Sequence, residues 1–584
     1  MKNKRNFFLW LSLLLLSGGI FSQNPLFIPD TLSGKTFNLN VQKGTNVFFA
    51  GFNTTTFGYN GSFLGPTLLM SKGDSITLNV TNNLPVDVTS VHWHGFHIPA
   101  KDDGSPFQPI APGKTWSPSF RIRNNAGTYW YHPHIHPKTE IQVMKGLAGM
   151  IIIRDSTEAT YNLPRTYNKD DFPIIVQTRI FDFFHQIATA THEDSIVMVN
   201  GTIDPYLKVP KQVVRFRLLN GSADRSYNFG LSNNADFYVI ASDGGLLEQP
   251  YQTKRVALSV GERAEILVDF TNDTIGQQTY LMSYASELPR GVIGADSVGT
   301  STLIIQDGYY QNPLNGVDFK LLRLDVTAPT ANAVTTIPTT FAPIKPFSIS
   351  DVSENRIITF YPDTVTSGKQ GYVDGPFTFN HKTFNMDSVT IITYLNNTEI
   401  WTLENKTLVA HPFHIHDIQF LVLDINGLPP PPELRGYKDV VLVKPNEKVR
   451  FVTKFENFAD DKVPYMFHCH LLHHEDDGMM GTFLVIDTTK TPAKVEELER
   501  DSNRLTVYQN FTDNELTIKT FSQKNGSSEL FMLDVLGRRQ KEIAKGNFSA
   551  GENQFKVDIN GLKRGSYFVV WIAEGHVQCK KIIR

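Results

Sequence analysis

Histidine is concentrated in four short clusters of this sequence. Ten of its 17 histidines lie in them. The clusters are His92-Trp93-His94, His132-Pro133-His134, His411-Pro412-Phe413-His414-Ile415-His416, and His468-Cys469-His470 with His474 and Met479 beyond it. Side chains two residues apart in a β-strand share a face, and the residue between them points the other way. Each His-x-His pair therefore predicts two imidazoles aimed at one metal site.

The fourth cluster is typical of a blue copper site. Such a site combines a thiolate, two imidazoles and a weakly bound thioether, and it passes single electrons. Cys469 and His474 supply two of these ligands, and His411 is the candidate for the second imidazole. Met479, ten residues after the cysteine, is the candidate for the axial thioether. We expect these four side chains to bind one copper ion.

The two histidines that flank Cys469 indicate a second copper centre. His468 and His470 must face away from the cysteine, so the three residues form a short covalent connection between two metal sites. Eight histidines are then left to hold three more copper ions: His92, His94, His132, His134, His414, His416, His468 and His470. Reduction of O2 to two waters takes four electrons. Four copper ions can hold all four, so partly reduced oxygen need not escape.

The four motifs, in this order and at these separations, resemble the multicopper oxidase family, which includes laccases, bilirubin oxidases and bacterial copper efflux oxidases. The resemblance covers residues 40–490. It implies four copper ions: one type 1, one type 2 and two type 3. It places His411, Cys469, His474 and Met479 on type 1, His92 and His414 on type 2, and His94, His132, His134, His416, His468 and His470 on type 3.

Two acids accompany the ligand motifs. Asp103 lies eleven residues after His92, and Glu475 directly follows His474. In the efflux oxidases the matching acids relay protons to oxygen, and the formation of water requires such acids. On spacing alone, Asp103 also fits a turn residue and Glu475 a solvated acid. The resemblance favours the relay for both.

Strand patterns dominate the rest of the chain. Residues 75–80, 212–218, 265–270 and 448–454 alternate apolar and polar side chains between turn-forming residues, as half-buried antiparallel strands do. Helical periodicity is scarce. Together with the resemblance, this pattern predicts an all-β chain with three cupredoxin-like Greek-key β-sandwich domains and a small C-terminal β-sandwich.

Polar, loop-like stretches suggest the domain boundaries. They lie at residues 154–172, 308–346 and 488–501. The expected units are cupredoxin domain 1 at 23–155, domain 2 without copper at 156–325, domain 3 with the type 1 copper at 326–490, and a C-terminal domain at 500–584. Residues 199–201, 215–220, 241–247 and 261–263 resemble the family's copper-free middle domain.

The N-terminus predicts an export signal over residues 1–22. Basic Lys2, Lys4 and Arg5 precede a short apolar run, and small residues follow it. The run is shorter than the ~20 residues of a spanning helix, so we expect no stable membrane insertion. The net charge of −3 offers no footprint for nucleic acid. A periplasmic, cell-surface or extracellular location follows.

The C-terminal segment carries none of the copper chemistry. Its strand-like pieces and basic end resemble the sorting domains of type IX secretion substrates, which implies the secretion machinery as a partner. A structural or carbohydrate-binding module is the alternative. Cys579 lies here, and because the only other cysteine is the ligand candidate Cys469, we expect no disulfide.

The expected activity is oxidation of a small reducing substrate with O2 as acceptor. A phenolic or similar aromatic donor, as in laccases, is the leading prediction. A cuprous or other metal oxidase is the first alternative, and a bilirubin oxidase-like enzyme the second. The efflux oxidases carry a methionine-rich insert in the third domain, but this chain has no methionine between Met282 and Met386. A non-catalytic copper protein would not need the complete ligand set.

Overall fold

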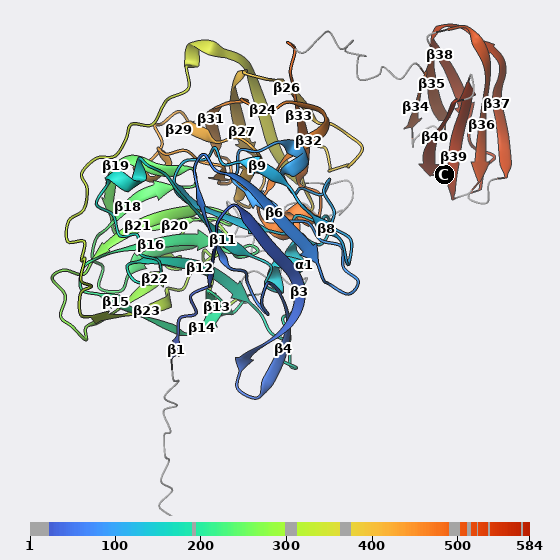
Figure 1. Ribbon diagram of the computed structural model, residues 1–584. Helices are drawn as coiled ribbons and strands as arrows, with labels where there is room; N and C mark the ends of the chain where they lie inside the picture. Colours follow the sequence, from blue (N-terminus) through green and yellow to red (C-terminus); the bar gives the residue numbers. More distant parts are fainter. Residues whose placement is uncertain are drawn as a thin grey trace, which may run out of the picture. The chain divides into compact units, whose positions relative to one another are not determined.

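The computed structural model describes residues 23–189, 194–297, 312–362 and 375–489 of the main body. In the C-terminal part it describes 503–510, 515–522, 524–534, 538–563, 565–573 and 576–583. The predicted export signal at 1–22 lies outside these residues. The chain divides into two compact units, residues 1–487 and 488–584. The prediction of an all-β chain is confirmed (Figure 1).

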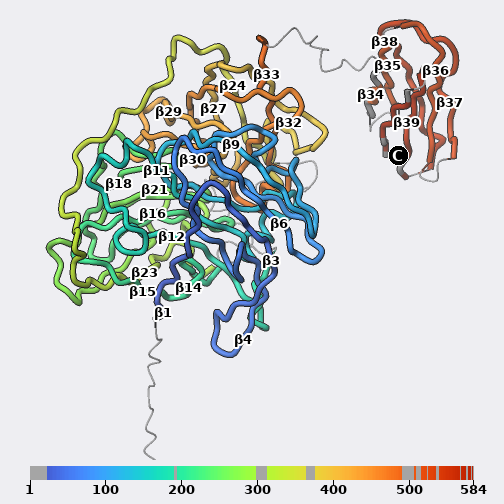
Figure 2. Tube along the Cα trace, in the orientation of Figure 1, coloured from blue at the N-terminus to red at the C-terminus, as the bar shows by residue number. Residues whose placement is uncertain are grey.

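The first sandwich pairs two sheets over one apolar core. One sheet runs in the order β2 (Thr31–Ser33), β5 (Thr67–Ser71), β11 (Gly149–Arg154), β10 (Gly127–His132), β7 (His92–His94). The other runs β4 (Phe52–Tyr59), β3 (Thr36–Phe49), β6 (Ser75–Asn82), β8 (Thr115–Trp116), with β9 (Ser119–Arg121) on β6. The β3–β4 hairpin projects from the body in both ribbon and tube (Figures 1 and 2). In β6 every second residue is buried, as its sequence alternation predicts.

The middle sandwich has the two largest sheets. The six-stranded sheet is β1 (Asn24–Pro25), β15 (Pro205–Pro210), β23 (Phe319–Thr327), β22 (Gln278–Ser283), β17 (Tyr227–Leu231), β20 (Val256–Leu258). The seven-stranded sheet is β14 (Thr202–Ile203), β13 (Ile196–Val199), β12 (Asp171–Arg179), β16 (Val213–Asn220), β21 (Arg263–Asp269), β18 (Phe237–Ser242), β19 (Gly245–Thr253). Strand β1 adds to this sandwich although it precedes the first one in the chain.

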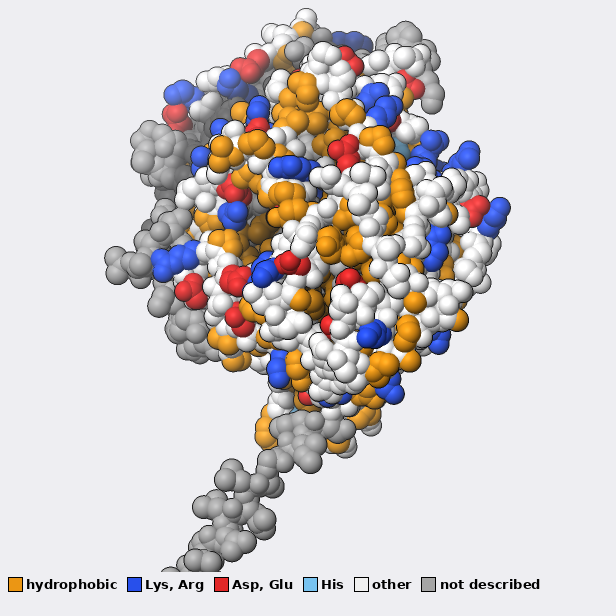
Figure 3. All heavy atoms as spheres, turned by 90° about the vertical axis from the view of Figure 1, so that its left-hand side faces the viewer, with side chains coloured by type: hydrophobic (Ala, Val, Ile, Leu, Met, Phe, Trp, Pro, Cys, Tyr) orange, Lys and Arg blue, Asp and Glu red, His pale blue; other side chains and the backbone are white. Residues whose placement is uncertain are grey.

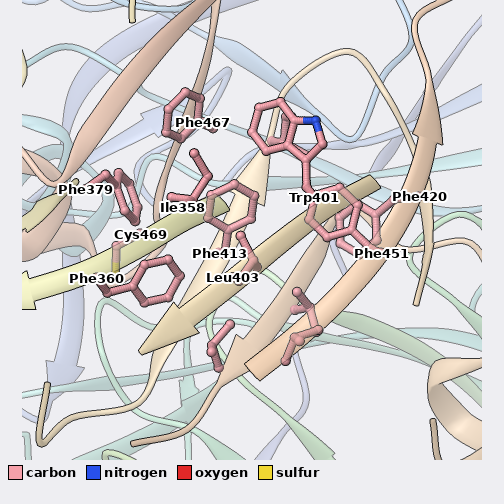
Figure 4. Close-up of a cluster of buried hydrophobic side chains, with 14 of the residues drawn as sticks. Ile358, Phe360, Phe379, Trp401, Leu403, Phe413, Phe420, Phe451, Phe467 and Cys469 are labelled. Carbon is pink, nitrogen blue, oxygen red and sulfur yellow. The ribbon is translucent and has the colours of Figure 1, made fainter. Parts of the chain in front are cut away.

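The third sandwich contains the candidate thiolate. Its sheets are β25 (Phe377–Phe379), β24 (Val352–Pro362), β27 (Thr398–Asn405), β31 (Lys448–Lys454), β29 (Phe420–Ile425), and β26 (Ile391–Tyr394), β33 (Met480–Ile486), β32 (Asp460–Cys469), β28 (His411–Ile415), β30 (Val440–Val443). Aromatic side chains fill the core between them, and Figure 4 shows Cys469 beside Phe360 and Phe379 in that core. The thiol therefore lies in an apolar, dry environment.

Among the described residues, helices are few and short. The α-helices there are α1 (Thr139–Met144) and α3 (Leu472–Asp476), and the 3-10 helices are η1 (Ala100–Asp102), η2 (Glu158–Thr160), η3 (Ala285–Glu287), η4 (Ile349–Asp351) and η5 (Pro432–Leu434). None of the described helices has the length and apolarity needed to cross a bilayer. On the face in Figure 3, basic and acidic side chains of the described residues are interspersed among apolar ones, in keeping with the small net charge.

The C-terminal unit is a separate two-sheet sandwich. Its sheets are β34 (Asn503–Asn510), β35 (Glu515–Ser522), β38 (Gly551–Asp558), and β37 (Arg539–Phe548), β36 (Gly526–Asp534), β39 (Ser566–Ala573), β40 (His576–Ile583). It has its own core, which includes the fully buried Leu516, Ile518 and Trp571. A unit with its own core can fold independently of the main body.

Candidate metal centre

Two strand pairs from different sandwiches carry the histidine motifs. In the first sandwich β7 pairs with β10, and His92 lies opposite His132. In the third sandwich β28 pairs with β32, and His414 lies opposite His468. Cys469 lies opposite Phe413 and therefore on the other face of β32 from His468. Strand alternation thus separates the thiol from the imidazoles, as the sequence predicts.

The motifs of the first and third sandwiches meet in one buried cluster of imidazoles. The ring of His92 stacks on that of His416 at a centroid distance of 3.9 Å, and the ring of His94 stacks on that of His414 at 3.8 Å. Eight imidazoles are almost wholly buried here: His92, His94, His132, His134, His414, His416, His468 and His470. The cluster therefore lies between two sandwiches, and neither sandwich holds it alone.

The ring nitrogens of this cluster fall into three groups, each within 4.8 Å. They are His94, His132 and His470; His134, His416 and His468; and His92 with His414, which also reach His94. The first two groups divide the six predicted type 3 ligands into two sets of three. The third contains the two predicted type 2 ligands. This arrangement can hold three metal ions.

The ring nitrogens that face into the cluster either have no hydrogen-bond partner or lie against another imidazole nitrogen. Nε2 of His92, His414 and His416 is buried without a hydrogen-bond partner among the described residues. Nε2 of His134 lies 3.2 Å from Nε2 of His468. Converging nitrogen lone pairs repel one another unless a cation lies between them. The donor set therefore fits copper, which imidazole ligands suit.

For His92, His414 and His416, hydrogen bonds on the outer side of the ring fix which nitrogen faces inward. His92 Nδ1 donates to the Asp103 carbonyl at 3.0 Å, and His414 Nδ1 donates to the Asp439 carbonyl at 2.8 Å. His416 Nδ1 donates to Asp103 Oδ2 at 2.7 Å. Since each of these bonds uses the Nδ1 proton, Nε2 is left as the ligand atom.

Burial also keeps the cluster imidazoles in their ligand form. Desolvation, with the neighbouring histidines adding to it, lowers the pKa of His94, His132 and His470 well below the usual range. Desolvation lowers the pKa of His416 to about 3. Only the neutral imidazole offers a lone pair to a metal, so the rings are ready to bind at neutral pH.

A second site lies on the other face of β32, around Cys469. Its Sγ is 3.4 Å from His411 Nδ1 and 3.6 Å from His474 Nδ1, and the three side chains form a candidate metal group. His411 Nε2 bonds Thr407 Oγ1 at 2.8 Å, which leaves Nδ1 to face the sulfur. Met479 is fully buried, and its carbonyl accepts the Cys469 N–H at 3.0 Å. Three of the predicted type 1 side chains therefore converge, and the backbone of the fourth residue, Met479, is hydrogen-bonded to that of Cys469.

The surroundings of Cys469 suit a metal ligand better than a reactive free thiol. Desolvation raises its pKa well above the usual range, so without a metal the sulfur stays protonated. Coordination deprotonates such a thiol. Phe377 packs against the rings of His411 and His474 at 4.7 and 4.5 Å and covers them with an apolar surface.

Both predicted acids lie against cluster histidines. Asp103 contacts His416 as described, and Glu475 lies 3.2 Å from both His134 Nδ1 and His468 Nδ1. Both acids are almost completely buried. Burial contradicts the alternative of a solvated acid for Glu475. Asp103 does lie in a bend, directly after η1, as its alternative of a turn residue expects, and its buried side chain also contacts the cluster.

Other residues complete the surroundings of the site. Asp439 accepts from His94 Nε2 at 3.1 Å, and no motif or spacing in the sequence predicts this residue at the site. His97 bonds Asp417 at 2.8 Å and His473 bonds Asp224 at 2.6 Å, so both have protein partners in place of a metal. Cys579 and Cys469 are free cysteines.

Known protein families match most of the chain. Three models described as multicopper oxidase match residues 40–158, 187–309 and 358–489. A model described as a secretion system C-terminal sorting domain matches residues 506–584. The multicopper oxidase mco of Staphylococcus aureus is 35% identical over 465 residues, which cover 78% of this chain and 90% of that protein. The cell division protein FtsP of Escherichia coli is 29% identical and covers 79% of this chain and 93% of its own length.

Solved structures of multicopper oxidases are also similar to this chain. A laccase-like multi-copper oxidase CueO from Ochrobactrum sp., described with oxidase activity towards lignin model compounds, has a TM-score of 0.68 and 31% identity over 79% of this chain and all of its own. A multicopper oxidase from Campylobacter jejuni, described as a metallo-oxidase, has a TM-score of 0.65 and 25% identity over 79% of this chain and 95% of its own. The expectation of cupredoxin-like sandwiches is confirmed.

Proposed function

The chain belongs to the multicopper oxidase family, and from this premise we propose that it oxidises a small phenolic or similar aromatic donor one electron at a time and reduces O2 to water with four copper ions. The observation that carries the proposal is the side-chain grouping at the end of β32 and in the residue that follows it. His468 and His470 point into a cluster that can hold three ions, while Cys469 between them belongs to a fourth group. A donor site and an oxygen site are thus covalently joined.

The chain's own residues hold and prepare both sites. His411, Cys469, His474 and Met479 would hold the type 1 ion. The eight cluster histidines would hold one type 2 and two type 3 ions. Bound copper supplies one-electron redox chemistry, with electrons entering at the thiolate site and O2 reduced at the cluster. Burial of both sites excludes bulk water from the metal ligands.

Water formation also requires protons, and we assign their delivery to Asp103 and Glu475. Both carboxylates lie against cluster histidines, on the chain segments next to the first and last motifs. The histidines themselves would be committed to metal. A positioned carboxyl group at hydrogen-bond distance is the usual means of such transfer.

The side chains of the third sandwich favour an aromatic donor over a metal ion. A cuprous-ion site would use soft thioether ligands. The chain has no methionine between Met282 and Met386, and the aromatic Phe377 covers both type 1 imidazoles. A solved relative is described as active on lignin model compounds. Metal oxidation is the second candidate, because another solved relative is described as a metallo-oxidase. A bilirubin-like donor is the third.

Steady-state O2 uptake by the copper-loaded protein tests these alternatives. We expect turnover with a panel of phenols, and kcat/KM for phenols above that for Cu(I), Fe(II) and bilirubin. Higher kcat/KM for Cu(I) or Fe(II) would assign a metal oxidase. Copper binding without O2 uptake with any donor would mean a copper carrier and would overturn the proposed activity.

One relative bears the name of a cell division protein, so sequence similarity alone does not decide between an oxidase and a protein without this activity.

We also infer that the C-terminal unit directs the protein out of the cell through a secretion system. The sorting-domain match and the separate core support this inference. The predicted location is periplasmic, cell-surface or extracellular. Fractionation of cells that express the full chain, compared with a chain that ends at residue 487, tests it: only the full chain should reach the cell surface or medium.

A further inference from the structure

Asp439 lies where side chains of all three sandwiches meet. Its Oδ1 accepts from Nε2 of His94 in the first sandwich at 3.1 Å. Arg263 of the middle sandwich donates to both of its oxygens, with Nη1–Oδ1 and Nη2–Oδ2 distances of 2.6 Å. Asp439, Arg263 and His94 are all buried. A bidentate pair of this kind fixes the carboxylate plane as well as its position.

The ion pair is held from behind by further buried charges. Asp243 accepts from the Arg263 backbone N–H at 2.8 Å and lies 3.0 Å from Lys438 Nζ. Lys438 also donates to Glu262 at 2.7 Å. Breaking a buried charge pair leaves a charge without compensation, so this network resists displacement of Asp439.

The hydrogen bond to Asp439 makes His94 different from its neighbours in the cluster. His92, His414 and His416 each use the Nδ1 proton for an outer hydrogen bond and turn Nε2 inward. His94 uses Nε2 for its outer bond, so only Nδ1 can act as a ligand. That nitrogen lies 3.4 Å from His132 Nε2 and 3.2 Å from His470 Nε2.

We propose that Arg263 and Asp439 are positioning residues that select Nδ1 of His94 as the copper ligand. This inference rests on the proposed function, since it assumes copper in the cluster. Asp439 keeps the His94 proton on Nε2, and Arg263 keeps Asp439 in the one orientation that allows it. The Asp439 carbonyl holds His414 at the same time. One residue of the third sandwich thus orients ligands from two sandwiches.

The backbone packs closely against this pair and against a neighbouring ligand ring. A Cβ at Gly95 would lie 2.5 Å from Asp439 Oδ2 and 2.8 Å from Arg263 Nη2. A Cβ at Gly261 would lie 3.0 Å from the His470 ring. Both glycines have positive φ, at 84°. The backbone at Gly95 therefore lies against the ion pair, and the backbone at Gly261 lies against the ring of His470.

Asp439→Asn is the informative substitution because it keeps shape and removes the symmetry of the carboxylate. If the amide oxygen faces His94, the amide NH2 opposes an Arg263 N–H. If the amide is turned over, its NH2 lies at the Oδ1 position, where it opposes Arg263 Nη1 and faces His94 Nε2. His94 Nε2 must then accept, and the proton moves to Nδ1. Nδ1 then has no lone pair for copper. Either orientation therefore breaks one of the two bonds from Arg263 that hold the side chain. We expect the cluster to lose copper at a chelator concentration 10- to 100-fold lower than the parent does, the usual effect of losing an outer partner of a ligand.

The measurements are copper per chain after dialysis against stepped chelator, the blue absorbance, and the EPR-detectable share of the remaining copper. The blue site touches neither residue, so its absorbance reports that the variant is folded. Asp171→Asn is the matched control. Asp171 is equally buried and pairs with Arg217 through both oxygens, at 2.7 and 3.0 Å, but contacts no cluster histidine.

Loss of cluster copper in Asp439→Asn, with the blue band kept and Asp171→Asn unchanged, supports the proposal. Parent-like copper retention in Asp439→Asn overturns it, and so does equal loss in the two variants, which would mean general destabilisation. If Asp439→Asn does not accumulate, Arg263→Lys replaces it, because lysine keeps the charge but cannot donate to both Asp439 oxygens in the same way. The same loss or retention of cluster copper then supports or overturns the proposal. A parent protein without cluster copper would instead contradict the proposed function itself.

Discussion

The two cysteines of the chain have different surroundings, and only Cys469 lies among metal-ligating side chains. The intense colour of a blue site comes from its thiolate, so we expect the copper-loaded protein to be blue. Cys469→Ser should abolish colour and turnover while the cluster keeps its three copper ions, since none of the cluster groups includes the sulfur. Absorption spectra and copper analysis check this, with the exposed Cys579→Ser as control. A blue Cys469→Ser protein would disprove the type 1 assignment.

The histidines of the cluster should separate electron entry from O2 reduction. His94→Ala and His470→Ala each remove one nitrogen from the same group of three, and neither residue belongs to the Cys469 group. We expect both variants to stay blue and to be bleached by a donor without air. Neither should consume O2 in steady state. Parent rates of O2 uptake in both would show that the cluster is assigned wrongly.

The two relay acids can be neutralised without a change of shape. In Asp103→Asn and Glu475→Gln we expect copper content and colour to persist and kcat to fall by roughly 10²- to 10⁴-fold, as is typical for loss of a positioned acid or base. Glu475→Gln should show the smaller loss if water partly replaces it. Asp102→Asn is the control, because Asp102 is buried beside Asp103 but pairs with Lys101 and with none of the cluster histidines. Unchanged kcat in both variants, with O2 reduction rate-limiting, would rule out the relay.

At the scale of single elements, the turn after β7 should tolerate no side chain. Gly95 has a φ of 84°, and the Cβ of Gly95→Ala would collide with Asp439. Gly51 has a φ of 85° in the β3–β4 turn, with open space around it. Both substitutions introduce the same backbone strain, of about 1–3 kcal/mol. We expect only Gly95→Ala to lose cluster copper as well, measured by thermal melts and copper analysis. Equal behaviour of the two variants would contradict the close approach.

Strand periodicity explains why the ligand set could be predicted from the sequence. In His468-Cys469-His470 the alternation of one strand separates two sites, and no knowledge of the tertiary structure is needed to see it. Asp439 could not be predicted in this way. Its contact with His94 depends on how the first sandwich packs against the third, and it lies 345 positions away in the chain. The division of six histidines into two groups of three likewise depends on that packing.

At the scale of the whole molecule, the predicted β architecture followed from alternation and turn residues, but the pairing of strands across sandwiches did not. Strand β1 joins the middle sandwich by parallel pairing with β15. Two residues carry too little pattern to specify such a partner. The depth at which Asp103 and Glu475 lie is also a property of the assembled body.

The division into two units predicts that the oxidase does not need its C-terminal part. All twelve predicted copper ligands lie before residue 488, and the C-terminal unit has a core of its own. A chain ending at residue 487 should be blue and should keep kcat within about a factor of two of the full chain, since no ligand is lost. O2 uptake and copper content per chain measure this. Loss of copper on truncation would show that the C-terminal unit supports the oxidase.

The chain separation of the ligands also imposes an order on assembly. His411 and Cys469 are 58 positions apart and lie within one sandwich, whereas His94 and His470 are 376 positions apart in two. Contacts between distant parts of a chain form late, because they close the longest loops. The proposed type 1 ligands can therefore come together early in folding, whereas the proposed cluster is complete only once the first and third sandwiches have docked. A molecule in which only the third sandwich has folded would hold the ligands for electron entry without the complete set for O2 reduction.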